Sequence, residues 1–396
     1  ARYAGMGRSL YATSPVFKRA IDECAARLAP YLERGLLEVI FAMPGDDTPI
    51  NETAYAQPGT FAIEYALASL WRSWGIEPVA VMGHSLGEYA AACVAGVLSL
   101  DDALRLVTER GRLTHALPAN GAMAAIFAPE SVVTAELART GGALTIAAYN
   151  GPEHFVVSGL RTEVEASLAH LEAAGVRVKL LRVPHAAHSR WIEPVLPAFR
   201  NALESVQFQA PRIGLVSNVS GGFVGVDEIG RADYWLSHMR QPVRFVQSIQ
   251  ALLAQGISHF IEIGPHPVLL GMGAECAAGA DVEWLPSLHR ERADWTDLLE
   301  GLQRLYVAGS DVNWAGFDAD RARRRVPLPT YPFRERRHWM DVVGQTAAAP
   351  ISADQRWAEL TTALQQQAER GPLDLNAASY PAKWACLERL TSAHAI

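Results

Sequence analysis

Apolar residues recur at helical spacing in the first hundred residues and alternate with one short apolar run. Ser14-Pro15 is a favourable helix start, since serine can cap the helix and proline suits its first position. Residues 59–75 predict a second helix, 77–82 a buried strand and 88–99 another helix. Helix, strand, sharp turn and helix together indicate an α/β unit with a parallel sheet. The apolar face of the first helix consists of Phe17, Ala20, Ile21, Cys24 and Leu28.

Residues 121–183 follow a different pattern, in which short strands alternate with two helices. The order strand, helix, strand, strand, helix, strand is typical of a ferredoxin-like fold, and it predicts a small subdomain inserted in the α/β domain. The parallel pattern resumes beyond it with strands in 213–221, 257–264 and 282–288. The inserted elements are expected at 121–128, 131–140, 144–150, 154–159, 161–175 and 176–183.

The last quarter of the chain changes in composition. Beyond about residue 310 it is rich in proline, arginine and aromatic residues, which favours a linker, and residues 345–355 indicate a flexible spacer before one amphipathic helix. We therefore expect four parts. They are an α/β core in 1–118 and 189–305, a small subdomain in 119–188, a linker in 306–345, and a spacer with the start of another domain in 346–396.

Composition and charge narrow the function. The net charge of −7 argues against nucleic acid as the main partner. A basic run between Arg321 and Arg337 favours a solvated linker or a docked helix over a phosphate site. The four scattered cysteines predict neither a disulfide framework nor a metal site. No apolar run is long enough for a membrane span and no signal peptide is visible, so we expect a cytoplasmic protein.

Residues 83–87, Gly-His-Ser-Leu-Gly, fit the G-x-S-x-G pattern of a nucleophilic serine between a strand and a helix. The two glycines would permit the strained turn and close packing of the helix on the strand. The Leu86 N–H would then lie at a helix N-terminus, where it can stabilise an oxyanion. The alternative is a glycine-bounded turn with an incidental serine. The strand and helix on either side favour Ser85 as the nucleophile.

A nucleophilic serine needs a base, and the best candidates are His185 and His188. Both follow the last strand of the inserted subdomain, at its seam with the core. No Asp or Glu stands at an evident strand end between Ser85 and these histidines. A backbone carbonyl could orient the imidazole instead, which would give a Ser–His dyad.

Arg110 lies 25 residues after Ser85, near the end of the next predicted helix. An arginine there is usually solvated or interacts with the helix dipole. Near a serine nucleophile it could bind a carboxylate through two hydrogen bonds, which a simple esterase does not need.

Blocks along residues 1–340 resemble the acyltransferase domains of modular polyketide synthases, which are relatives of bacterial malonyl-CoA:acyl carrier protein transacylases. The resemblance implies an α/β-hydrolase-like core with a ferredoxin-like subdomain and an active site between them. The blocks include "YAGMGRSLY", "GHSLGEYAAACVAGVLSL", "RGRLTHALPANGAMAAI", "YNGPEHFVVSG", "HAAHSRWIEPVL", "LVSNVSG", "QPVRF", "IEIGPHPVLL" and "LPTYPF".

The resemblance also implies roles for single residues. Ser85 would hold the acyl group, His188 would act as general base and acid, and a carbonyl near Arg244 would orient His188. Arg110 would bind the free carboxylate of the extender unit. The other substrate-binding residues implied are His84, Leu86, Gln57, Asn150, His185 and Ala187.

Two departures from the family pattern concern activity and selectivity. The family's first strand ends in Gly-Gln-Gly, whose Gln helps to form the oxyanion hole, and it should stand just before Ala1. Malonyl-selective members usually have His-Ala-Phe-His where this chain has His-Ala-Ala-His. His185 and Leu86 therefore favour malonyl, whereas Ala187 removes a bulky wall and could admit a larger branch.

The expected function is transfer of an extender unit, malonyl in the first place, from CoA to the phosphopantetheine arm of an acyl carrier protein. Methylmalonyl or a larger extender is the alternative within this chemistry; a serine hydrolase or thioesterase and a non-catalytic docking module are alternatives outside it. No bound cofactor is expected. A ketosynthase would precede the domain, and the tail weakly resembles the first helices of a methyltransferase domain.

Overall fold

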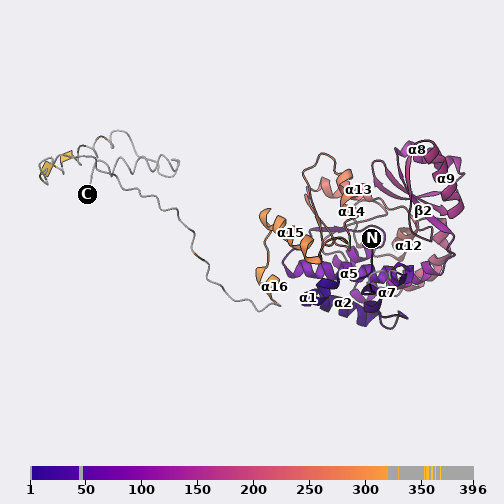
Figure 1. Ribbon diagram of the computed structural model, residues 1–396, viewed down its shortest axis with the longest axis horizontal. Helices are drawn as coiled ribbons and strands as arrows, with labels where there is room; N and C mark the ends of the chain where they lie inside the picture. Colours follow the sequence, from indigo (N-terminus) through magenta and orange to yellow (C-terminus); the bar gives the residue numbers. More distant parts are fainter. Residues whose placement is uncertain are drawn as a thin grey trace. The chain divides into compact units, whose positions relative to one another are not determined.

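The computed structural model describes residues 2–43 and 48–319, together with positions 329, 352, 354, 355, 358, 359, 362 and 366. The described core is an α/β structure in which most of the chain is helical (Figure 1). The basic run, the spacer and the following domain that the sequence predicted lie outside the described residues or touch them only at single positions. None of the described helices is long and apolar enough to span a membrane.

Helix α2 (Pro15–Leu28) begins where the sequence predicted. α2 is capped by Ser14, whose hydroxyl accepts the N–H of Phe17 at 3.3 Å, and Pro15 is its first residue. The helices of this part of the chain are α1 (Arg8–Thr13), α2 (Pro15–Leu28), α3 (Leu36–Ile40), α4 (Thr48–Asn51), α5 (Thr53–Ser73), α6 (Gly87–Val94) and α7 (Leu100–His115).

Helix α5 begins at Thr53, six residues before the predicted start, so this boundary was wrong. Pro58 lies inside the helix and removes the hydrogen bond that its nitrogen would otherwise make one turn back. The added residues 53–58 are half-buried at their start and buried from Ala56 on, and the carbonyls of Thr53 and Ala54 lie 3.0 and 3.3 Å from where a Cβ on Gly111 would be. Because Gly111 has no side chain, the first turn of α5 packs directly on α7 and brings Gln57 close to Arg110.

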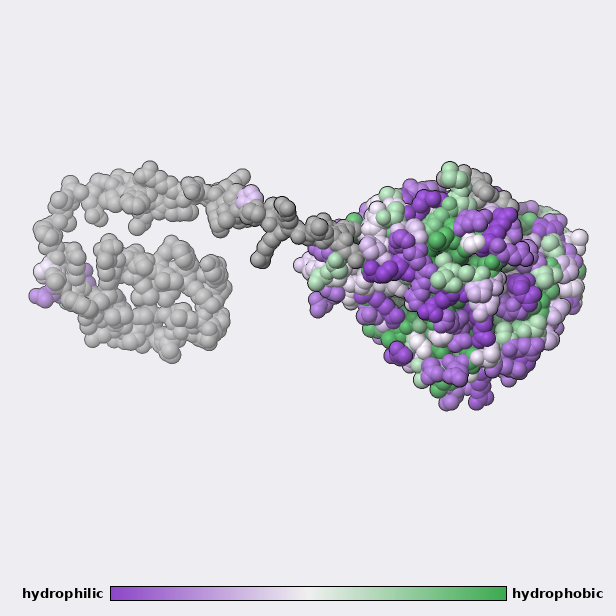
Figure 2. Space-filling view, turned by 90° about the horizontal axis from the view of Figure 1, so that it is seen from below, coloured by the Kyte–Doolittle hydropathy of each residue, from purple (hydrophilic) through white to green (hydrophobic). Residues whose placement is uncertain are grey.

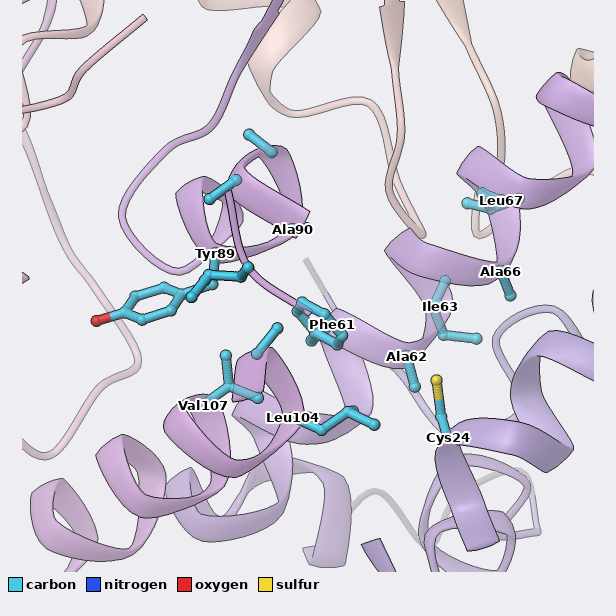
Figure 3. Close-up of a cluster of buried hydrophobic side chains, with 14 of the residues drawn as sticks. Cys24, Phe61, Ala62, Ile63, Ala66, Leu67, Tyr89, Ala90, Leu104 and Val107 are labelled. Atoms are coloured by element: carbon cyan, nitrogen blue, oxygen red, sulfur yellow. The ribbon is translucent and has the colours of Figure 1, made fainter. Parts of the chain in front are cut away.

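Helices α2, α5, α6 and α7 share one apolar core beneath the Gly-His-Ser-Leu-Gly turn. Figure 3 shows Phe61 of α5 among Tyr89 of α6 and Leu104 and Val107 of α7, with Cys24 of α2 nearby. Burial of large side chains such as these stabilises the fold by roughly 1.5–3 kcal/mol each. This layer holds the start of α6 in place.

The parallel pairing that the sequence predicted is present in two short sheets. β1 (Ala80–Met82) pairs with β6 (Gly214–Val216), so that Met82 lies opposite Val216. β7 (His259–Glu262) pairs with β8 (Glu283–Pro286). The carboxyl ends of β1 and β6 are therefore adjacent, and the residues after both strands meet at one edge.

The small subdomain is a four-stranded antiparallel sheet with the order β3-β4-β2-β5, covered by two helices. This order confirms the ferredoxin-like prediction, and the subdomain has its own apolar core around Ile126, Phe155 and Leu168. Its elements are β2 (Gly121–Phe127), α8 (Glu130–Arg139), β3 (Thr145–Gly151), β4 (His154–Leu160), α9 (Arg161–Ala173) and β5 (Arg177–Leu180).

Backbone hydrogen bonds fasten the subdomain to the core at two places. The Gly121 N–H donates to the Pro184 carbonyl at 3.2 Å, and a Cβ on Gly121 would lie 2.3 Å from the Ala186 nitrogen. Tyr149 of β3 donates to the Val243 carbonyl at 2.8 Å. Segments 184–188 and 241–244 are thus held at the seam between the two bodies.

The remaining helices surround the core. The face shown in Figure 2 has polar and apolar residues side by side. These helices are η1 (Arg190–Val195, a 3-10 helix), α10 (Leu196–Leu203), α11 (Val226–Ile229), α12 (Ala232–Arg240), α13 (Phe245–Ala254), α14 (Leu269–Cys276), α15 (Asp294–Val307) and α16 (Trp314–Asp318).

Candidate active site

Ser85 lies in the turn between β1 and α6 with a backbone φ of 52°, in the left-handed region. This conformation costs a residue other than glycine of order 1–3 kcal/mol and persists only where the surroundings enforce it. A Cβ on Gly83 would lie 2.1 Å from the Glu88 nitrogen, so the turn requires glycine there. Gly87 has open space around it, so the steric role predicted for both glycines applies to Gly83 alone.

The side chains of Ser85 and His188 meet across the seam. The Ser85 Oγ lies 2.7 Å from His188 Nε2, and His188 Nδ1 lies 2.8 Å from the Gln241 carbonyl oxygen. A carbonyl can only accept, so Nδ1 has the proton and Nε2 is free to accept one from the serine hydroxyl. The orienting carbonyl belongs to Gln241, three residues before the predicted neighbourhood of Arg244.

The protonation state of His188 suits a general base. Burial lowers its pKa to about 3, and the nearby Arg110 guanidinium acts in the same direction. The imidazole is therefore neutral at physiological pH. This arrangement can activate a serine hydroxyl for attack on a carbonyl carbon.

Arg110 is buried beside the serine. Its Nη1 donates to Gln57 Oε1 at 2.6 Å and its Nη2 to Ser85 Oγ at 3.2 Å. Its Nε has no hydrogen-bond partner, and no carboxylate among the described residues forms an ion pair with this guanidinium. Burial accordingly lowers the pKa of Arg110. A buried cation with spare donors favours binding of an anionic group next to Ser85.

The N–H groups of the turn have different partners. The Ser85 N–H donates to Asn218 Oδ1 at 2.6 Å, whereas the Gly87 N–H donates to the His84 carbonyl at 3.1 Å. The Leu86 N–H makes no hydrogen bond within the described part of the chain. It lies at the start of α6 and is available as an oxyanion donor.

The other sequence-predicted residues surround this centre in different ways. His84 Nε2 donates to Asn150 Oδ1 at 2.8 Å, a bond that joins the serine turn to β3 of the subdomain. His185 is buried and its Nδ1 has no partner. Ala187 is half-buried on the same loop. Burial lowers the pKa of both His84 and His185.

Sequence reasoning missed Asn218 and Gln241. Asn218 follows β6 as Ser85 follows β1, and this shared position at the carboxyl end of paired parallel strands was the available signal. Gln241 contributes only a backbone carbonyl, for which a sequence gives no chemical signal. Among the described residues, no cluster of His, Cys, Asp or Glu could hold a metal, and Cys24, Cys93 and Cys276 are free thiols.

Comparisons with known proteins identify relatives. A family described as "Acyl transferase domain" matches residues 1–312. The chain is 42% identical over 353 residues to Polyketide synthase GfsB of Streptomyces halstedii, covering 87% of this chain and 6% of that protein. It is 40% identical over 348 residues to Mycoketide-CoA synthase of Mycobacterium tuberculosis, covering 88% and 8%. The chain thus spans only a small fraction of these curated relatives.

Solved structures agree with these matches. The acyltransferase domain from the second module of the salinomycin polyketide synthase is 43% identical, with a TM-score of 0.77 and coverage of 84% of this chain and 77% of that one. MCAT from Streptococcus pneumoniae is 31% identical, with a TM-score of 0.67 and coverage of 76% and 96%.

We predict that Gly83→Ala and Gly87→Ala differ sharply. The new Cβ at position 83 would collide with the start of α6, so the free energy of unfolding should fall by more than about 3 kcal/mol. At position 87 the change should be below about 1 kcal/mol, since the space is open. Urea unfolding of both variants measures the difference. Equal stabilities would contradict the steric requirement at Gly83.

Proposed function

Since this chain belongs to the family of acyltransferase domains of modular polyketide synthases, we propose that it transfers a malonyl unit from malonyl-CoA to the phosphopantetheine thiol of an acyl carrier protein. The observation that supports this proposal most directly is the buried Arg110 beside a Ser85–His188 pair. Arg110 supplies the cation that an acyl group with a free carboxylate needs. The reaction takes place in the cytoplasm, within a multidomain synthase that supplies the carrier protein.

In the first half-reaction, His188 Nε2 accepts the Ser85 hydroxyl proton as Oγ attacks the thioester carbonyl of malonyl-CoA. The Leu86 N–H stabilises the resulting oxyanion. The carbon–sulfur bond then breaks, His188 returns its proton to the CoA thiolate, and Ser85 keeps the malonyl group as an ester. In the second half-reaction the phosphopantetheine thiol attacks this ester by the same steps, and Ser85 is restored.

Arg110 binds the malonyl carboxylate during both steps. Gln57 accepts a hydrogen bond from Nη1, which leaves Nε without a partner and Nη2 beside Ser85 Oγ. The hydrogen bond from Nη2 to Ser85 Oγ is 3.2 Å long, and a carboxylate would take over this donor as the serine is released for attack. A simple hydrolase of uncharged esters would leave this guanidinium buried without a counter-charge, which disfavours that alternative.

Malonyl is preferred over branched extenders because of the residues beside the dyad. By resemblance to malonyl-selective relatives, Leu86 and His185 favour the smaller unit. Ala187, which is half-buried on the loop before His188, leaves more room than the phenylalanine usual in such relatives. We therefore propose malonyl as the main substrate, with some use of methylmalonyl.

The function itself is tested by intact-mass analysis after mixing the protein with malonyl-CoA. We expect one added malonyl group, located on Ser85 by peptide mapping. Ser85→Ala should show no addition, and His188→Ala should lose acylation. His185→Ala serves as the matched control, since it should mainly alter substrate preference. Unchanged labelling of Ser85→Ala would exclude Ser85 as the nucleophile.

Arg110→Ala separates transfer of a charged acyl group from ordinary ester chemistry. Loss of a charged contact of about 3–4 kcal/mol should slow acylation by malonyl-CoA by roughly two to three orders of magnitude. Acylation by acetyl-CoA should rise relative to malonyl-CoA, because an uncharged group no longer leaves a buried guanidinium unpaired. The measurement is the acylation rate with malonyl-CoA divided by the rate with acetyl-CoA, in wild type and in the variant. If this malonyl-to-acetyl ratio does not fall in Arg110→Ala, the proposed role of Arg110 is wrong.

Ala187→Phe tests extender selectivity. The larger side chain should reduce use of methylmalonyl-CoA more than use of malonyl-CoA, by a factor corresponding to about 1–3 kcal/mol for one methyl group. Competition between the two substrates, read by mass spectrometry, gives the ratio. An unchanged ratio would mean that position 187 does not contact the acyl branch.

A further inference from the structure

The side chain of Asn218, which lies outside the turn that presents Ser85, makes two hydrogen bonds to the backbone of this turn. Asn218 Oδ1 accepts the Ser85 N–H at 2.6 Å, and Asn218 Nδ2 donates to the Gly83 carbonyl at 2.8 Å. Both bonds fall on the short stretch in which Ser85 adopts its left-handed conformation. An amide offers both the acceptor and the donor that this pattern requires, without a charge.

Asn218 is placed there by the parallel pairing of β1 and β6. Met82 of β1 lies opposite Val216 of β6. Ser85, three residues after Met82, and Asn218, two residues after Val216, are therefore neighbours. The side chain of Asn218 is 1% exposed, so water does not compete for its hydrogen bonds.

The main chain of Asn218 is tied to the base as well. The Arg244 N–H donates to the Asn218 carbonyl at 2.9 Å, and Arg244 ends the short loop that begins with Gln241. The Gln241 carbonyl orients His188. One residue thus contacts both the segment that holds the nucleophile and the segment that orients the base.

The buried carboxyl group of Glu88 holds Asn218 in place. Glu88 Oε2 accepts the Asn218 N–H at 2.7 Å, and its Oε1 accepts the hydroxyl of Tyr234, which also lies 2.7 Å from Ser217 Oγ. Glu88 is fully buried one turn after Ser85, and its own N–H donates to the Ser85 carbonyl at 3.0 Å. The hydrogen bonds therefore close a ring around the turn.

We propose that Asn218 is a positioning residue of the acyl-transfer centre, which sets the approach of Ser85 to His188 through this ring and is itself held by Glu88 and Tyr234. The inference deepens the function proposed above, and it concerns how the serine is presented rather than which acyl group it takes. Misplacement of reacting atoms by about 1 Å can lower a rate by about 100-fold.

Asn218→Leu tests the ring with a side chain of nearly the same size and shape. The leucine has neither the acceptor for the Ser85 N–H nor the donor for the Gly83 carbonyl. We expect Ser85 to react with phenylmethylsulfonyl fluoride about 100-fold more slowly. In this reaction Oγ bonds to sulfur, fluoride leaves and His188 takes the proton. The acylation rate at saturating malonyl-CoA should fall similarly, with KM within about 3-fold of wild type.

Glu88 provides a conservative pair of variants. Burial raises the pKa of Glu88 to about 7. A glutamine at this position can accept the Asn218 N–H through its oxygen and donate an N–H to the Tyr234 oxygen, whose own proton then points to Ser217 Oγ. Glu88→Gln should therefore keep at least about a third of the labelling rate, whereas Glu88→Leu should lose it about as Asn218→Leu does. Ser287→Ala is the control, because it removes a buried hydrogen bond to Trp71 that is not part of the ring. It should label at the wild-type rate.

Labelling rates are measured per folded protein, with folding followed by near-UV circular dichroism. Wild-type labelling of Asn218→Leu overturns the proposal, and so does equal labelling of the two Glu88 variants. If Asn218→Leu does not fold, the Glu88 pair decides. The sulfonyl fluoride needs no CoA substrate, so failure of malonyl transfer in the wild type would count against the proposed function and leave this inference standing.

Discussion

The left-handed conformation of Ser85 is the constraint on which the rest of the site depends. It aims the hydroxyl at His188, which is 103 residues away in the sequence, and it places the Leu86 N–H at the start of α6. An isolated turn would not keep this conformation. Gly83 permits this conformation because it has no side chain to collide with the start of α6. The apolar core that α6 shares with α2, α5 and α7 holds α6 itself in place.

Arg110 links the kind of acyl group that is bound to the basicity of His188. Burial lowers the pKa of His188, and the guanidinium of Arg110 lowers it further, so the imidazole is neutral at physiological pH. A bound carboxylate would cancel part of the guanidinium charge. Proton transfer to the imidazole would then become more favourable when a charged acyl group is present than when an uncharged one is.

Features determined by neighbours in sequence were predictable, and those determined by distant contacts were less so. The serine turn, the cap at Ser14 and the ferredoxin-like order all follow from local patterns. The start of α5 was wrong because burial against Gly111 outweighs the hydrogen bond that Pro58 removes. Arg110 lies on another helix, so the sequence pattern left a solvated arginine and a carboxylate-binding one both open, and the resemblance to the family favoured the second. Asn218 was missed because only strand pairing brings it to the turn.

The close approach at Gly121 has a consequence for recombination between related domains. A side chain at this position would collide with the loop before His188, and the Gly121 N–H is bonded to Pro184 on the same loop. The subdomain and the loop that ends at His188 therefore form one geometric unit. A chimera that exchanges the subdomain has to take both of its edges, residue 121 and residues 184–188, from the same parent, or the imidazole shifts away from the serine.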